Sequence, residues 1–179
     1  MRMTAKPITE DFPDREQLEA LAAEAFPPAE YLSPGRLIEM AKEDGFDDWA
    51  LYSDGAFAGF MTVLTCGGMA YLFFLAIDGK RRSQGLGSEA LRLLRTLYPQ
   101  KTQVVDLEMQ DARAANSAQR ERRRAFYVRS GYRATGQYLS YLGVDYEVLC
   151  RDGSFDPAAF RELMRHVPLA GFSPRYFRR

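Results

Sequence analysis

The sequence predicts an α/β fold in which a mixed, mostly antiparallel central sheet of about seven strands is flanked by helices. Its length of 179 residues suits one compact domain. Apolar residues recur at spacings of three and four in some segments and form short β-rich runs in others. The pairs Asp54-Gly55 and Gly67-Gly68 separate successive β-rich runs, as hairpin turns do. We therefore expect residues 1–179 to form a single domain, with residues 152–179 as a C-terminal helix and tail extension.

Strands and helices are expected in an order that builds one sheet covered by helices. Strands are expected over residues 6–8, 49–52, 57–65, 69–77, 102–109, 138–142 and 146–150. Helices are expected over residues 14–26, 33–45, 86–97, 116–130 and 156–167. Asp14 is expected to cap the first helix, and the pairs Ser33-Pro34 and Asp156-Pro157 open two others.

Composition excludes several classes of protein. Hydrophobic residues at 46% and charged residues at 27% exclude disordered, collagen-like and disulfide-scaffold chains. No run approaches the roughly 18 apolar residues of a membrane span, and the first residues lack the apolar core of a secretory signal, so we expect a cytoplasmic protein without a membrane partner. Cys66 and Cys150 are too few and too far apart for a metal cage or a CxxC motif. We expect no metal and interpret both cysteines as buried apolar side chains.

The formal net charge of zero is an average over two unlike parts of the sequence. Residues 1–60 contain 13 acidic and 5 basic residues, a net charge of −8. Residues 61–179 contain 11 acidic and 19 basic residues, a net charge of +8. Such an asymmetry favours one part that meets anions and another that attracts cations.

The segment around residues 71–97 contains the most informative pattern. An apolar run, YLFFLAI, is followed by DGKRRSQGLGSEAL and then by helical spacing. The first amides of a helix lack intrahelical partners and carry partial positive charge. Gly85 and Gly87 would let a phosphate approach these amides closely. A Gly-x-Gly pair is weak evidence for a phosphate site by itself. The alternative interpretation is a plain strand-to-helix turn that binds no ligand.

Two motifs together resemble the GNAT superfamily, whose members transfer acetyl from acetyl-CoA to an amine. Arg82-x-x-Gly85-x-Gly87 after LAID is similar to the family's acyl-CoA signature. The segment FYVRSGY, at residues 126–132, is similar to the family's Tyr-x-x-x-Gly-aromatic helix ending. The resemblance covers residues 4–150 in the order of elements. It implies a GNAT-like fold, an acyl-CoA N-acyltransferase domain and acetyl-CoA as co-substrate.

The resemblance also implies a set of cofactor-binding residues. Main-chain groups of the strand before the loop would bind the pantetheine arm, and loop amides would bind the pyrophosphate. By position, these residues are Leu75, Ala76, Ile77, Arg82, Ser83, Gln84, Gly85, Leu86, Gly87 and Ser88. Asn116 matches a family asparagine that hydrogen-bonds the cofactor arm, although its separation of eleven residues from Tyr127 departs from the shorter family spacing.

Tyr127 and Glu108 are the catalytic residues that the resemblance implies. Tyr127 occupies the position of a tyrosine that protonates the leaving thiolate, and the pKa of a phenol, about 10, suits that task; a buried helix aromatic is the alternative. Glu108, near the end of its strand, would accept the proton that the amine must lose. Asp106 competes with Glu108 for this role, and a water molecule alone is a third option. A surface strand carboxylate without a catalytic role is the remaining interpretation of Glu108.

Two other features are not expected to carry the chemistry. The basic run Arg120, Arg122, Arg123 and Arg124 is interpreted as a solvated helix face, or as a face that meets CoA phosphates or partner carboxylates. Nucleic acid is not expected as a partner, because one basic helix turn is a weak footprint. His166, the only histidine, is expected to have a surface or capping role.

The sequence therefore predicts an acetyl-CoA-dependent N-acetyltransferase that acts on a primary amine by direct attack, with a small-molecule amine favoured. Protein or peptide N-acetylation is one alternative. A catalytically silent acyl-CoA-binding sensor is another. A homodimer is compatible with the sequence, which does not identify the acceptor.

Overall fold

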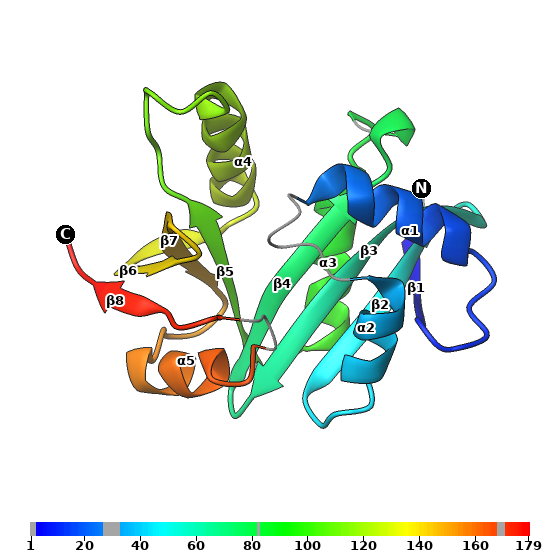
Figure 1. Cartoon of the computed structure of the whole chain (residues 1–179), viewed down its shortest axis with the longest axis horizontal. Coiled ribbons are helices and arrows are strands. Elements are labelled where there is room, and N and C mark those ends of the chain that lie inside the picture. Colours follow the sequence, from blue (N-terminus) through cyan, green and yellow to red (C-terminus); the bar gives the residue numbers. More distant parts are fainter. Residues whose placement is uncertain (1–2, 27–32, 82, 168–170) are drawn as a thin grey trace. The chain divides into compact units, whose positions relative to one another are not determined.

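The computed structural model describes residues 3–26, 33–81, 83–167 and 171–179. Its strands are β1 (Met3–Pro7), β2 (Phe46–Ser53), β3 (Ala56–Cys66), β4 (Met69–Ile77), β5 (Thr102–Glu108), β6 (Arg133–Tyr141), β7 (Val144–Arg151) and β8 (Arg175–Phe177). Its helices are α1 (Arg15–Ala25), α2 (Pro34–Met40), α3 (Leu86–Leu97), α4 (Ser117–Arg129) and α5 (Pro157–Met164), with a short 3₁₀ turn, η1, at Gly79–Arg81. Figure 1 shows these elements along the chain.

The strands are hydrogen-bonded in the order β1-β2-β3-β4-β5-β7-β6-β8. The β4–β5 pair is parallel and joins Met69–Tyr71 to residues 102–104, whereas β1–β2, β2–β3, β5–β7, β6–β7 and β6–β8 are antiparallel. The expected α/β class and mostly antiparallel sheet are confirmed. The observed sheet of eight strands agrees with the expected number of about seven; the strand that was not predicted, β8, has three residues and no alternating pattern in the sequence.

The chain divides into two compact units. The first consists of Met1–Thr65 and Leu72–Pro99, and the second of Cys66–Tyr71 and Gln100–Arg179. Each unit has its own sheet segment and its own helices, so the two are described separately.

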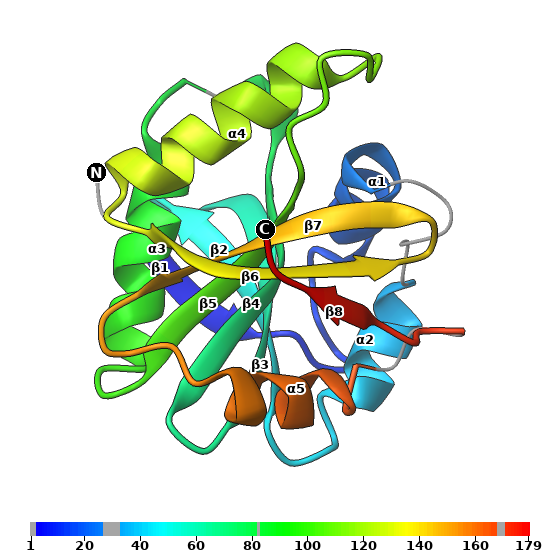
Figure 2. The same cartoon turned by 90° about the vertical axis from the view of Figure 1, so that its left-hand side faces the viewer.

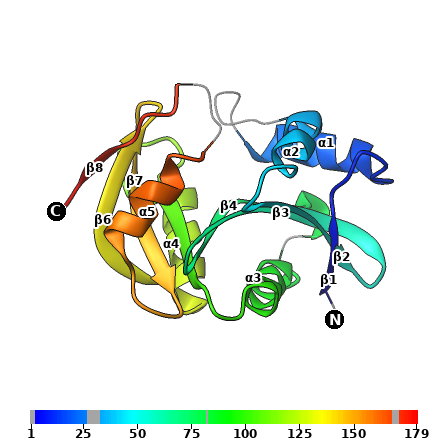
Figure 3. The ribbon, with the colours of Figure 1, turned by 90° about the horizontal axis from the view of Figure 1, so that it is seen from below.

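In the first unit, α1 and α2 lie on one face of the sheet and α3 on the other (Figure 3). Buried Leu18, Leu21 and Leu37 anchor α1 and α2 in a core that includes Phe60 and Phe74. The expected Asp14 cap was wrong in its detail. Asp14 stands at the N-cap position of α1, but its carboxylate makes no cap hydrogen bond and instead accepts from the Tyr52 hydroxyl at 2.5 Å.

In the second unit, α4 and α5 lie on opposite sides of the β6–β7 hairpin (Figures 1 and 2). Leu142 and Gly143 form its two-residue turn with positive φ values of 48° and 79°, as a type I′ turn requires. The Asp156 side chain caps α5 by accepting hydrogen bonds from the amides of Ala158 and Ala159. Cys150 is buried here, and Cys66 is partly exposed.

No helix in the described part of the chain combines the length and apolar character needed to cross a membrane.

Candidate active site

The first candidate site element is the loop from β4 to α3, in the first unit. Ser83 and Gly85 both adopt positive φ, 64° and 79°. Gly85 is the N-cap residue of α3, and no side chain caps this helix. A Cβ at Gly85 would meet nothing within 4 Å, so glycine suits this position through its backbone conformation rather than through tight packing. The loop therefore presents uncapped helix amides without an acidic side chain at the cap.

Arg81 holds the start of this loop in place. Its guanidinium donates to the carbonyl oxygens of Phe57 at 3.2 Å and Ser53 at 3.4 Å, in the β2–β3 hairpin. No local sequence pattern predicts this role, because Arg81 and the hairpin are more than 20 residues apart. Arg82, which the GNAT-like motif implicates, lies outside the described residues.

The expected pantetheine-binding residues Leu75, Ala76 and Ile77 are the last three residues of β4. The neighbouring strand approaches them closely at Gly59, where an added Cβ would overlap the carbonyl oxygen of Ala76. Directly after β4, the Asp78 amide donates a hydrogen bond to the Ala58 carbonyl oxygen at 2.9 Å. These contacts define where the strand ends and the loop begins.

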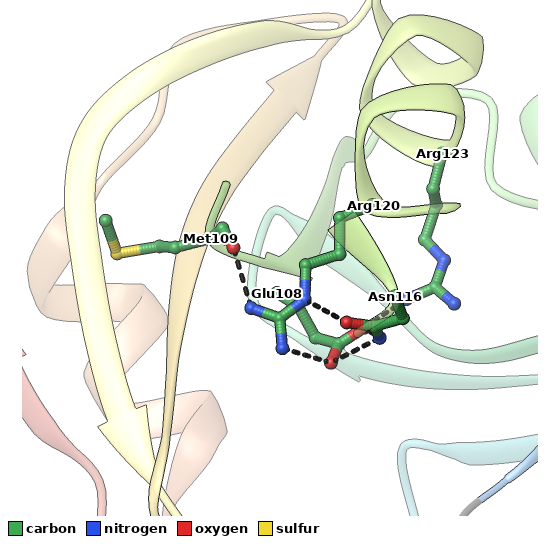
Figure 4. A network of polar contacts seen from close by, with 5 residues as sticks. All are labelled: Glu108, Met109, Asn116, Arg120 and Arg123. Atoms are coloured by element: carbon green, nitrogen blue, oxygen red, sulfur yellow. Dashed lines mark hydrogen bonds and ion pairs between the residues drawn. The ribbon is translucent and has the colours of Figure 1, made fainter. Parts of the chain in front are cut away.

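The second unit contains a charged network at the end of β5 (Figure 4). Glu108 accepts from Arg123 Nη1 at 3.0 Å, and its other oxygen lies 3.1 Å from Arg120 Nη2. The Asn116 amide donates to both Glu108 oxygens at 3.3 Å, and its own oxygen accepts from Arg120 Nε at 2.8 Å. Arg120 also donates to the Met109 carbonyl at 2.8 Å. The structure thus brings Glu108 and Asn116 together and surrounds Glu108 with cations.

Asp106, the competing candidate base, has very different partners. The hydroxyls of Tyr71 and Tyr141 donate to its two oxygens at 2.7 Å and 2.8 Å. Tyr141 stacks on Tyr146 with ring centroids 4.1 Å apart, and burial raises its pKa above the ordinary value. Two neutral hydroxyls thus donate to Asp106, whereas Glu108 is held by two guanidinium groups as well as by the neutral Asn116 amide.

Tyr127 is buried on α4 and packs against aromatic rings. Its ring lies 5.2 Å from that of Tyr132, whose hydroxyl donates to Gln103 Oε1 at 2.9 Å. Burial is the main reason that the pKa of Tyr127 is raised; the charge of Arg123 opposes this shift, and that of Asp106 adds to it. The phenol is therefore protonated near neutral pH.

The basic run of α4 contacts carboxylates at three of its four positions, although Arg123 and Arg124 stay partly exposed to solvent. Arg120 and Arg123 bind Glu108, and Arg124 donates to Glu147 through two hydrogen bonds of 2.7 Å and 3.1 Å. Glu147 is only 9% exposed and was missed in the sequence analysis. A charged residue inside the apolar run of β7 was the signal that could have found it.

Among the described residues, no group of three or more His, Cys, Asp or Glu side chains is placed to hold a metal ion.

A family model described as the acetyltransferase (GNAT) family matches residues 15–132, about two thirds of the chain. The chain belongs to the GNAT family. This GNAT protein is therefore an acyltransferase, as its motifs indicated. Its sequence matches no curated protein.

Solved structures of other GNAT proteins share its fold. One is a GNAT-family protein from Bacteroides thetaiotaomicron, with 23% identity, a TM-score of 0.69 and coverage of 93% of this chain and 94% of that one. Another is the ribosomal-protein-S18-alanine N-acetyltransferase from Escherichia coli, with 21% identity, a TM-score of 0.60 and coverage of 87% and 96%. A third is an aminoglycoside 6′-N-acetyltransferase complexed with coenzyme A, with 17% identity, a TM-score of 0.65 and coverage of 84% and 96%.

Proposed function

We propose that this GNAT protein transfers acetyl from acetyl-CoA to a primary amine by direct attack, with no covalent enzyme intermediate. The observation that carries the proposal is the uncapped N-terminus of α3 behind the positive-φ residues Ser83 and Gly85. Unpaired helix amides and the helix dipole favour a phosphate at such a position. Membership of the family supplies the reaction class.

We assign the pyrophosphate of CoA to the backbone amides of residues 83–88, together with Arg82. The pantetheine arm is assigned to main-chain groups of Leu75, Ala76 and Ile77. The solved aminoglycoside 6′-N-acetyltransferase was complexed with coenzyme A, which supports acetyl-CoA as the co-substrate here.

Tyr127 is proposed as the proton donor to the departing CoA thiolate. Attack of the amine nitrogen on the thioester carbonyl forms a tetrahedral intermediate, and its collapse breaks the carbon–sulfur bond. The electron pair of that bond leaves with sulfur, which then takes the phenolic proton. The raised pKa of Tyr127 keeps the phenol protonated at neutral pH, but it also makes the phenol a weaker acid than the ordinary value of about 10 that suits this transfer.

Glu108 is proposed as the proton acceptor for the amine, directly or through water. Its contacts set a condition on this role: Arg123, Arg120 or Asn116 must yield a hydrogen-bonding position before Glu108 can take a proton. Asp106 is the competing acceptor, and two neutral tyrosine hydroxyls donate to its oxygens. For Asn116, the proposed contact with the cofactor arm would require its amide to leave Glu108.

A small cationic amine is the favoured acceptor. Residues 1–60 carry a net charge of −8, which would raise the local concentration of a cation. An aminoglycoside acetyltransferase among the fold neighbours is consistent with a small acceptor, although another neighbour acetylates a ribosomal protein.

A panel of amines tests the proposal. The purified chain is incubated with acetyl-CoA and spermidine, kanamycin or a peptide with an N-terminal alanine, and CoA release is followed with a thiol reagent. Turnover of spermidine or kanamycin supports the proposal, whereas turnover of the peptide alone identifies a peptide acetyltransferase. Acetyl-CoA binding without turnover of any amine indicates a silent sensor.

Two substitutions test the residue roles on the amine with the highest turnover. Tyr127→Phe should lower kcat by about tenfold to a thousandfold, because a general acid contributes on that order. Glu108→Gln should lower kcat/KM most at low pH, where the amine is most fully protonated. An unchanged kcat in Tyr127→Phe, or an unchanged pH–rate profile in Glu108→Gln, would remove that residue from its role.

A further inference from the structure

Helix α4 forms three arginine–carboxylate contacts with its sheet. The structure describes all 13 of its residues, which include five arginines, and only Tyr127 is buried. The 12-residue α3 differs, because Leu86, Ala90, Leu91 and Leu94 are all buried. Apolar packing alone therefore does little to define the position of α4.

The Arg124–Glu147 ion pair is the best-defined contact of this helix with β7. Glu147 lies on the middle strand of three, where its neighbours across the sheet are Leu107 on β5 and Tyr138 on β6. Both of its oxygens accept from the guanidinium, at 2.7 Å and 3.1 Å. Two parallel hydrogen bonds set orientation as well as distance. Because Arg124 binds Glu147 in this way, the charge of its guanidinium is already neutralised. Arg124 is therefore not available to bind another anion.

Tyr127 shares one helix face with these ion pairs. Arg124 and Tyr127 are three residues apart, and Arg123 and Tyr127 are four apart, so all three side chains lie on neighbouring positions of α4. The Tyr127 ring packs against the ring of Tyr132, just after the end of the helix. The Tyr132 hydroxyl donates a hydrogen bond to Gln103 on β5. A shift of α4 along or around its axis would therefore move the Tyr127 phenol.

We propose that Glu147, through its bidentate ion pair with Arg124, is a positioning residue for Tyr127. This inference rests on the proposed role of Tyr127 as proton donor. Glu147 touches neither acetyl-CoA nor the amine in this account; it acts by holding the helix that carries the phenol. Misplacement of a reacting group by about 1 Å can lower a rate about a hundredfold.

A double-mutant cycle tests the proposal with acetyl-CoA and whichever of spermidine, kanamycin or the alanyl peptide gives the highest kcat. Glu147→Gln should lower kcat about tenfold or more, while KM for acetyl-CoA changes less than about twofold. In a Tyr127→Phe background, Glu147→Gln should have little further effect, because the group that it positions is gone. Arg122→Gln removes an exposed arginine from the same helix and should leave kcat unchanged.

The possible outcomes separate the two proposals. Equal effects of Glu147→Gln with and without Tyr127 would overturn the positioning role and leave the role of Tyr127 intact. A Tyr127→Phe variant with normal kcat would overturn the role of Tyr127 and with it the inference. If Glu147→Gln does not fold, Arg124→Lys replaces it, since it keeps the charge and loses the bidentate geometry.

A spectroscopic readout makes the test independent of the acceptor. The protein is labelled with [13Cζ]tyrosine, and the Tyr127 resonance is assigned by its loss in Tyr127→Phe. Glu147→Gln should shift or broaden this resonance, whereas Arg122→Gln should not. An unchanged Tyr127 resonance in Glu147→Gln would contradict the proposal even if none of the three amines is acetylated.

Discussion

The two compact units compensate buried carboxyl groups in opposite ways. Asp48, on β2 of the first unit, is 3% exposed; one oxygen accepts from the Thr62 hydroxyl, and the other, Oδ2, has no hydrogen-bond partner among the described residues. Glu147, on β7 of the second unit, has Arg124 on both oxygens. Burial raises the pKa of Asp48 to about 7. A proton thus neutralises one carboxyl group, and a guanidinium neutralises the other.

The two units therefore respond to different perturbations. A carboxyl group that depends on a proton makes its unit sensitive to pH. A carboxylate that depends on a bidentate arginine makes its unit sensitive to the geometry of one helix. In the proposed function, the second arrangement lies beside Tyr127, where precise placement matters most.

The largest expected effect concerns the pH dependence of stability at Asp48. Its pKa is about 7 in the folded chain and 3.8 in the reference state. Between about pH 4 and pH 7 the folded state retains a proton that the unfolded state has lost, so stability falls as pH rises through this window. The fall is on the order of 4 kcal/mol. Asp48→Asn should remove it, as measured by urea unfolding at pH 4, 5.5 and 7.

The wild-type chain is the reference for this measurement, and the slope of stability with pH is the quantity compared. An equal slope in Asp48→Asn would mean that Asp48 is not protonated in the folded state near neutral pH.

Removing the cation from Glu147 should have the next largest effect. Arg124→Gln leaves Glu147 buried without its charge partner, and breaking a buried pair in this way costs about 3–5 kcal/mol. We expect the lower end, about 3 kcal/mol, because the Arg124 side chain is 38% exposed. Urea unfolding at pH 7 measures the loss.

Arg122→Gln is the matched control, with an expected change within about 0.5 kcal/mol. A loss no larger than that of the control would show that Glu147 does not depend on Arg124, and the contrast with Asp48 would fail.

The smallest effect is expected at Thr62, whose hydroxyl donates to Asp48 and lowers the pKa of that carboxyl. Thr62→Val removes this donor, so the pKa of Asp48 should rise further and the pH-dependent fall should extend above pH 7. The stability lost at pH 7 should be about 1–2 kcal/mol. Unfolding curves at pH 7 and 8 check this expectation, and an unchanged curve at both values would argue against a hydrogen bond from Thr62.

Much of the fold could be predicted because local patterns determine it. The helical spacing after Gly85, the Asp54-Gly55 turn and the β-rich run before the loop are all short-range signals. The edge strand β8 was missed, since its pairing with β6 joins segments far apart in the sequence. Asp14 stands at the expected N-cap position, but its carboxylate binds the hydroxyl of Tyr52, 38 residues away, instead of a helix amide.

The candidate site shows the same limit. The sequence displays the arginine run of α4, but not the carboxylates that the run meets. The ion pair between Arg124 and Glu147 depends on the register of β7 between β5 and β6, which is a long-range feature of the sheet. Similarly, the spacing between Asn116 and Tyr127 suggested a departure from the family pattern, and only the structure shows that the Asn116 amide lies on Glu108.

Two-substrate initial-rate kinetics show whether acetyl passes directly from acetyl-CoA to the amine. Acetyl-CoA and the best amine of the panel are varied together, and double-reciprocal plots are compared. Direct attack requires both substrates to be bound at once and predicts intersecting lines, with no acetylated protein after incubation with acetyl-CoA alone. Parallel lines accompanied by an acetylated protein would contradict the account, since they indicate a covalent acetyl-enzyme.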